Sequence, residues 1–215
     1  MANQFVNLWK FLFSYLICES VANLPNFSEE VKNSLIFLKK GRTILYPTDT
    51  IWGIGCDATN EEAINRIFEV KQRTETKSMI ILVDSIDRLL RYIKDFPLNA
   101  EELIEYSEKP LTIIYPNAQN LPKNLIADDG SIAIRVTKDP FCKELIARFG
   151  KPIVSTSANK SGKQAPVNFN AIEKDIVSVV DYVVNLRQNE KATNQPKPSS
   201  IIKLGMKGEF EIIRK

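Results

Sequence analysis

The stretch SIAIRVTKDPFCKELIARFGKPIVSTSAN, residues 131–159, sets out a strand, a helix and a second strand in direct succession. Apolar side chains occupy every second position within 131–137, which predicts a strand and turns Arg135 away from its apolar face. Pro140 after an aspartate is typical of a helix start, and Gly150 is typical of the position just beyond a helix end. The apolar run that follows predicts the next strand, so this stretch indicates an α/β protein.

The same alternation of strand and helix patterns runs through the chain on both sides of this stretch. Further strands are expected at residues 43–46, 79–83, 111–115 and 182–186, with a final hairpin joining 200–204 to 209–213. Helices are expected at residues 28–40, from a capping box at Thr59 and Glu62 to about Gln72, after Ser85, after Pro97, and near Ala171. This order predicts an α/β domain with a mixed sheet.

The composition is that of an ordinary globular protein with one informative absence. The chain has 215 residues, a net charge of +3 and no histidine. A Ser-His-Asp or Cys-His nucleophile and a histidine metal site are therefore excluded. Cys18, Cys56 and Cys142 are far apart and odd in number, which predicts neither a zinc site nor a disulfide framework and favours a reducing cytoplasm. Chemistry would have to rest on Lys, Arg, carboxylates, hydroxyls and backbone amides.

An apolar segment, FVNLWKFLFSYLIC, occupies residues 5–18. It is shorter than the roughly 20 apolar residues of a membrane-spanning helix. A signal peptide would carry positive charge before its apolar part, and residues 1–9 contain no Lys or Arg. We interpret residues 1–26 as an N-terminal extension of unknown role and expect no membrane association. A signal sequence is the minor alternative.

Two polar clusters lie in the first half of the chain. YPTDTIWGIGCD, residues 46–57, offers two threonine hydroxyls in a glycine-rich segment, and taken alone it favours a simple glycine-rich turn. KQRTETKS, residues 71–78, carries three cations. Lys71 extends the apolar stripe of Ile64 and Phe68 and is expected to point inward. Cations at a helix C-terminus are common in their own right, but this group favours an anion site.

Two further clusters lie in the opening stretch. Arg135 could equally face solvent or an edge, and Ser155–Asn159 could be only a turn after a strand. Hydroxyls and free backbone N–H groups in such a turn can also form a concave anion-binding site.

The combination of these clusters is more specific than any one of them. PTDT-x-W-G-x-G-C, K-x-R followed by Lys77, IAIRV, STSAN-x-SG and PSSI occur in that order. In this the chain resembles the YrdC/TsaC family of threonylcarbamoyl-AMP synthases, from about Phe27 to the C-terminus. It departs from the family pattern at Trp52, at Thr74 and at residues 107–110.

The resemblance implies a single YrdC-like catalytic domain at residues 27–215. Its expected fold is a twisted mixed parallel and antiparallel sheet, flanked by helices around a basic concave cavity. The implied reaction converts ATP, L-threonine and bicarbonate into threonylcarbamoyl-AMP and pyrophosphate. The product would pass to separate transferase proteins that modify a tRNA adenosine. Mg²⁺ is expected with ATP, held mostly by phosphates and water, with no protein metal site.

The resemblance also implies roles for particular residues. Lys71 and Arg73 are expected to be catalytic and, with Lys77, to bind the phosphates and the bicarbonate-derived carboxylate. Arg135 is expected to bind the threonine carboxylate. The remaining members of the predicted ATP and threonine site are Thr48, Thr50, Ser131, Ser155, Ser157, Asn159 and Ser199.

Two other functions stay open at this point. The same basic cavity could serve a non-catalytic RNA-binding or ribosome-maturation module, although a net charge of +3 is modest for that role. A related carbamoyl transferase domain is the second alternative. ATP turnover that needs both threonine and bicarbonate would distinguish the enzyme from the binding module.

Overall fold

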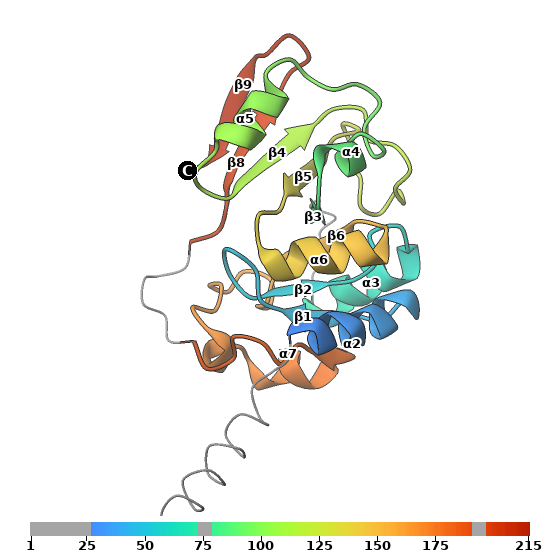
Figure 1. Ribbon diagram of the computed structural model, residues 1–215, viewed down its shortest axis with the longest axis vertical. Helices are drawn as coiled ribbons and strands as arrows, with labels where there is room; N and C mark the ends of the chain where they lie inside the picture. Colours follow the sequence, from blue (N-terminus) through green and yellow to red (C-terminus); the bar gives the residue numbers. More distant parts are fainter. Residues whose placement is uncertain (1–26, 73–78, 191–196) are drawn as a thin grey trace, which may run out of the picture.

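The computed structural model describes residues 27–72, 79–190 and 197–215, and it shows an α/β fold built on a mixed sheet (Figure 1). The strand order is β7-β1-β2-β6-β3-β5-β4-β8-β9. Three neighbouring pairs, β1–β7, β3–β5 and β4–β8, are parallel, and the other neighbours are antiparallel. The predicted mixed α/β sheet flanked by helices is therefore confirmed.

The elements have these bounds. The strands are β1 (Ile44–Tyr46), β2 (Gly53–Gly55), β3 (Ile80–Val83), β4 (Leu111–Tyr115), β5 (Ile132–Val136), β6 (Ile153–Ser157), β7 (Tyr182–Val183), β8 (Ser200–Leu204) and β9 (Phe210–Arg214). The helices are α2 (Phe27–Lys39), α3 (Glu61–Val70), α4 (Ile86–Leu89), α5 (Ala100–Tyr106), α6 (Pro140–Phe149), α7 (Lys174–Val179) and the 3₁₀ turn η1 (Phe169–Ala171).

The sheet separates two apolar clusters because successive side chains of a strand point to opposite faces. In β1, Ile44 and Tyr46 pack with α2 and α6, whereas Leu45 packs with α3 and α7 on the other face. In β3, Leu82 joins the α2 and α6 cluster, while its neighbours join the opposite cluster. The two helix layers therefore enclose the sheet from both sides over the half of the molecule that contains β1.

The ends of α6 form as the sequence predicts. Asp139 is the N-cap, and its side chain accepts a hydrogen bond of 2.9 Å from the backbone N–H of Cys142. Gly150 follows the helix at φ 78°, a left-handed conformation that glycine adopts without a Cβ penalty. Because α6 connects β5 to β6, these caps fix where β5 ends and where β6 begins. β5 and β6 are the two neighbours of β3 in the sheet.

The start of α3 differs from the prediction. Asn60 caps the helix by accepting from the N–H of Ala63 at 3.0 Å, whereas Thr59 was the expected cap. The hydroxyl of Thr59 instead donates to Asp57 Oδ1 at 2.7 Å. Because the Thr59 hydroxyl is bound to Asp57, it does not cap the helix, and Asn60, the next polar residue, occupies the N-cap position.

The glycine-rich segment after PTDT is a strand and not the simple turn that its sequence favoured. β2 pairs with β1 on one side and with β6 on the other. A Cβ at Gly55 would lie 2.4 Å from the carbonyl oxygen of Val154 and 2.7 Å from the ring of Tyr46. The glycine is therefore required by the close approach of a buried tyrosine and a neighbouring strand.

Residues 1–26 lie outside the described residues, so their assignment as an N-terminal extension stays a prediction. Within the described part of the chain, no helix has the length and apolar character needed to cross a membrane.

Candidate functional site

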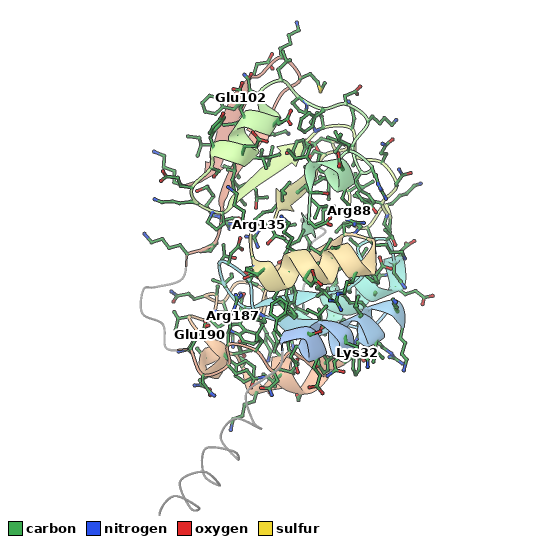
Figure 2. The ribbon with its side chains drawn as sticks, viewed as in Figure 1. Lys32, Arg88, Glu102, Arg135, Arg187 and Glu190 are labelled. Atoms are coloured by element: carbon green, nitrogen blue, oxygen red, sulfur yellow. The ribbon has the colours of Figure 1, made fainter. Side chains whose placement is uncertain are left out.

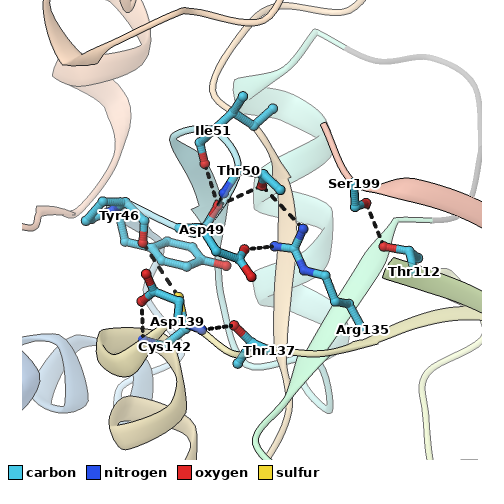
Figure 3. A network of polar contacts seen from close by, with 12 residues as sticks. Tyr46, Asp49, Thr50, Ile51, Thr112, Arg135, Thr137, Asp139, Cys142 and Ser199 are labelled. Carbon is cyan, nitrogen blue, oxygen red and sulfur yellow. Dashed lines mark hydrogen bonds and ion pairs between the residues drawn. The ribbon is translucent and has the colours of Figure 1, made fainter. Parts of the chain in front are cut away.

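A cavity of about 410 Å³ opens on the sheet face that also carries α2 and α6. Leu82 and Ile153 lie under α6 on this face, and they are paired with each other across β3 and β6. The register places Arg135 beside Leu82 in β5. In Figure 2, Arg135 lies just above α6 in the view, and in Figure 3 its side chain extends toward the loop after β1. The cavity begins where the cover of α6 ends.

The hydroxyl wall of this cavity comes from β6, which continues through Ser157 and does not stop before the STSAN residues. Ser155 and Ser157 follow Ile153 at every second position, so they share its face of the sheet and line the cavity. Ser157 is paired with Gly53 of β2. A Cβ at Gly53 would lie 3.4 Å from the Ser155 hydroxyl, so the glycine leaves room in front of the serines.

Asn159 shapes the turn that follows β6. Its side-chain N–H groups donate to the carbonyls of Lys160 at 3.0 Å and Lys163 at 2.6 Å. Its Oδ1 is buried and has no hydrogen-bond partner among the described residues. Lys163 itself lines the cavity, which the sequence analysis did not anticipate.

Lys71 points inward, as its place on the α3 stripe predicts, and its side chain is only 4% exposed. The ammonium donates to the carbonyls of Ser157 at 2.6 Å and Asn159 at 2.7 Å. In the described structure it thus joins the end of β6 to the turn that follows, and it is not one of the residues that line the cavity. Arg73 and Lys77 lie outside the described residues, and the roles expected for them, like the catalytic role expected for Lys71, stay predictions.

The PTDT segment forms a compact polar turn beside Arg135 (Figure 3). Thr48 Oγ1 donates to the carbonyl of Ile51 at 2.7 Å and accepts from the N–H of Thr50 at 3.1 Å. Thr50 lines the cavity, and its hydroxyl accepts a 3.3 Å hydrogen bond from Arg135 Nη1. Thr48 therefore acts in this structure by shaping the turn that presents Thr50.

Asp49 lies behind Arg135. Its Oδ1 is 3.2 Å from Arg135 Nη2, an ion pair that lacks the geometry of a directed hydrogen bond. Burial raises the pKa of Asp49, and the positive charge of Arg135 opposes that rise. Arg135 Nε is buried and has no hydrogen-bond partner among the described residues. The guanidinium is thus held at its terminal nitrogens and has an unpaired donor along its side.

Ser199 and Arg214 form the opposite wall. The Ser199 hydroxyl is 2.7 Å from Thr112 Oγ1, and its carbonyl accepts from Arg214 Nε and Nη2 at 2.9 and 2.8 Å. Burial, and after it the nearby charge of Arg135, lower the pKa of Arg214. Arg214 is a cavity residue that the sequence analysis missed. The predicted hairpin ended at Ile213, one residue too early to draw attention to it.

Ser131, like Thr48 and Lys71, is a predicted site residue that is not part of the cavity lining. It lies before the first residue of β5, and its hydroxyl donates to Asp129 Oδ1 at 2.6 Å. Lys203 and Ser131 hydrogen bonds lower the pKa of Asp129 from 3.8 to about 2. A role for Ser131 beside the nucleotide stays a prediction.

The cavity therefore combines guanidinium and ammonium groups with hydroxyls. Arg135, Arg214 and Lys163 line it together with Thr50, Ser155, Ser157 and Ser199, and no Asp or Glu of the described residues is among its lining. Charge-assisted donors of this kind suit carboxylates and phosphates, and guanidinium groups can bind them in a bidentate manner. Fold and site define an α/β protein with a cavity lined by cationic side chains and hydroxyls on its sheet.

Comparison with known proteins gives this class a family. The chain belongs to the Sua5/yciO/yrdC family, whose model, described as "Telomere recombination", matches residues 36–215. The family expected from the sequence motifs is confirmed.

Three similar proteins show how far the likeness extends. The chain is 35% identical to a threonylcarbamoyl-AMP synthase of Pseudoalteromonas translucida (strain TAC 125), over 76% of this chain and 87% of that protein. It is 26% identical to P. abyssi Sua5, solved in complex with L-threonine, with a TM-score of 0.71 over 81% of this chain. The match covers 50% of that longer chain. E. coli YciO, at 21% identity, shows the same fold with a TM-score of 0.74 over 89% of this chain and 91% of that one.

Proposed function

We propose that this protein is a threonylcarbamoyl-AMP synthase, a nucleotidyltransferase of the cytoplasm. It would combine ATP, L-threonine and bicarbonate into threonylcarbamoyl-AMP and pyrophosphate, for transfer to a tRNA adenosine by separate proteins. The observation that carries the proposal is the cavity with guanidinium groups and hydroxyls on facing walls and no acidic lining among the described residues. The names of the curated relatives support this function over a non-catalytic RNA-binding module.

The chemistry suits a chain without histidine. The threonine amine attacks the carbon of bicarbonate, a C–O bond of bicarbonate breaks and water leaves, and an N-carboxylate is formed. An oxygen of that carboxylate then attacks the α-phosphorus of ATP. The bond from the α-phosphorus to the bridging oxygen breaks, and pyrophosphate leaves with the electron pair. Negative charge builds up on the phosphates in this step, so fixed cationic donors can stabilise it without a covalent intermediate. Holding three reactants together also lowers the barrier.

The described residues can be given roles in this reaction. Arg135 would bind the threonine carboxylate beside Thr50, because both residues line the cavity and Arg135 Nη1 donates to the Thr50 hydroxyl. Arg214 on the opposite wall would bind phosphate oxygens. The hydroxyls of Ser155 and Ser157 would donate to the reacting groups between them. Lys71 would keep these serines in place through the turn that it anchors.

The roles of Arg73 and Lys77 follow from the family resemblance alone. They are proposed to bind the phosphates and the bicarbonate-derived carboxylate, from the segment that follows Lys71. Mg²⁺ would enter as the complex with ATP. Mg²⁺ commonly keeps several waters and binds through substrate phosphates, so the phosphates and water would supply most of its ligands.

The test is the substrate dependence of pyrophosphate release. Release should require L-threonine and bicarbonate together, and L-serine should support much less of it. Arg214→Lys should reduce kcat/KM for ATP at least tenfold, because a lysine cannot replace two guanidinium contacts. Arg148→Lys is the matched control, since Arg148 forms an exposed ion pair with Glu144 on α6. Equal release without threonine would refute the proposed function.

A further inference from the structure

The Asp49–Arg135 pair contains a feature that ligand binding by Arg135 does not by itself require. Asp49 comes from the turn between β1 and β2, and Arg135 comes from β5, which lies three places away from β2 in the sheet. The carboxylate is 3.2 Å from Arg135 Nη2, and the side chains are 18% and 4% exposed. Figure 3 shows the carboxylate pointing at the guanidinium. Asp49 is not among the residues that line the cavity.

The contacts of the guanidinium leave one side of it unused. Thr50 accepts from Nη1, and Asp49 attracts Nη2. Nε is buried and unpaired among the described residues. A planar guanidinium presents its five N–H donors in a fixed fork, so fixing the two terminal nitrogens also fixes the direction of Nε–H.

The charges around Asp49 favour this arrangement. Asp139, on the other side, is held at the N-terminus of α6, and its Oδ2 is 2.6 Å from Arg187 Nη1. The negative charge of Asp139 raises the pKa of Asp49, whereas Arg135 and Arg187 lower it, and burial has the largest effect, which raises it. A carboxylate that is repelled from one side and buried gains most from the guanidinium in front of it. Arg135 is therefore pulled toward a fixed position.

We propose that Asp49 is a positioning residue for the carboxylate of the amino-acid substrate, which it never touches and on which it acts through Arg135. The inference rests on the proposed function for the identity of that substrate. Asp49 holds Arg135 Nη2 while Thr50 holds Nη1, and the substrate carboxylate binds where Arg135 lines the cavity. Asp49 thereby sets the affinity for the amino acid and leaves the phosphate-binding wall at Arg214 unaffected.

Kinetics on two variants test this role. Asp49→Asn keeps the size of the side chain and removes its charge, and it should raise KM for L-threonine about tenfold, with KM for ATP unchanged and kcat changed much less. Asp49→Glu restores the charge and should recover part of the affinity. A lower KM for threonine in Asp49→Asn would overturn the proposal, because Asp49 would then be a competitor of the substrate carboxylate. An unchanged KM with a lower melting temperature would overturn it as well.

The matched control is Asp57→Asn. Asp57 is also a buried carboxylate in an ion pair, 2.7 Å from Lys151, and it does not line the cavity. This variant should lower the melting temperature and leave KM for threonine unchanged.

A spectroscopic measurement separates this proposal from the proposed function. The ¹⁵N resonance of Arg135 Nε–H, assigned through Arg135→Lys, should be protected from solvent exchange in the wild-type protein. It should lose that protection in Asp49→Asn and keep it in Asp57→Asn. Retained protection in Asp49→Asn overturns the positioning role, whether or not the wild-type protein turns over. Absence of threonine-dependent pyrophosphate release in the wild-type protein refutes the proposed function instead.

Discussion

Lys71→Met is the change that most directly tests how the site is held together. Methionine keeps an unbranched apolar stem of similar length and removes the ammonium that donates to Ser157 and Asn159 at 2.6 and 2.7 Å. Hydrogen bonds to charged groups contribute about 1.5–3 kcal/mol each, and the desolvation of a buried cation offsets part of that gain. We expect a net loss of about 3 kcal/mol in the free energy of unfolding. For a domain of this size that corresponds to a melting temperature lower by roughly 6–12 °C.

Turnover should fall together with stability. The two carbonyls that lose their donor belong to Ser157, the last residue of β6, and to Asn159 in the turn that follows it. A displacement of about 1 Å at a reacting group can reduce the rate on the order of a hundredfold. Thermal melts and pyrophosphate release are measured on the same preparations, with turnover assayed well below the melting temperature of the variant. Lys151→Met is the control. Its single ion pair with Asp57 involves a half-exposed ammonium, and such pairs contribute about 0–1 kcal/mol.

The two measurements together can refute the anchoring role. If Lys71→Met melts like the wild-type protein and loses turnover, the ammonium contributes to catalysis as a ligand of the substrates and not as an anchor of the turn. If it melts lower and turns over normally, the position of the turn does not matter for the reaction. Either result would contradict the reasoning.

Two further predictions follow from local contacts. Gly55→Ala places a methyl group 2.4 Å from a backbone carbonyl and should destabilise the protein by about 1–3 kcal/mol, whereas Gly53→Ala meets its nearest atoms at 3.4 Å and should cost clearly less; chemical denaturation compares the two. Equal losses would refute the steric argument. Ser131→Ala removes a hydrogen bond to Asp129 and should raise the pKa of that carboxyl above its value of about 2, as followed by NMR titration. Because the folded-state pKa lies below the ordinary value, ionised Asp129 stabilises the fold above about pH 4 and loses that effect as the pH falls toward 2, so the variant should be less sensitive to acid. A nucleotide-binding role for Ser131 would instead raise KM for ATP and leave the pKa of Asp129 unchanged.

The parts of the fold that could be predicted depend on local chemistry. Asp139 and Gly150 define α6 because a cap and a left-handed residue act within one helical turn. The alternation in β5 placed Arg135 opposite the apolar side chains for a similarly local reason. β2 was missed because its outer residues are glycines, which give no alternation of side chains to recognise. Its strand character comes from pairing with β6, about 100 residues further along the chain.

The site could be predicted only in part for the same reason. The strand period fixes the face on which Arg135, Ser155 and Ser157 lie, and these three residues line the cavity. Thr50, Asn159 and Ser199 also line it, but they lie in loops, where spacing fixes no face. The partners of a side chain are a different matter, because they are set by tertiary structure. The ammonium of Lys71 is bound by two backbone carbonyls. Every residue has a backbone carbonyl, so the sequence cannot show which of them accept this ammonium. Arg214 pairs with Ile201 of β8, beyond the point where the register of β8 and β9 shifts at a bulge. The sequence does not show this pairing, which places Arg214 at the cavity.

Two guanidinium groups on one cavity create an electrostatic problem that the fold has to solve. Burial, and after it the charge of Arg135, lower the pKa of Arg214, and through the second effect the two groups disfavour each other. In the structure the two arginines contact different kinds of partner. Arg214 donates to the carbonyl of Ser199, an uncharged acceptor, whereas Arg135 faces the carboxylate of Asp49. One guanidinium is thus partly neutralised and the other keeps its full charge. This difference agrees with the roles proposed for the two arginines, because the multiply charged phosphates of ATP need more positive charge than the single carboxylate of an amino acid.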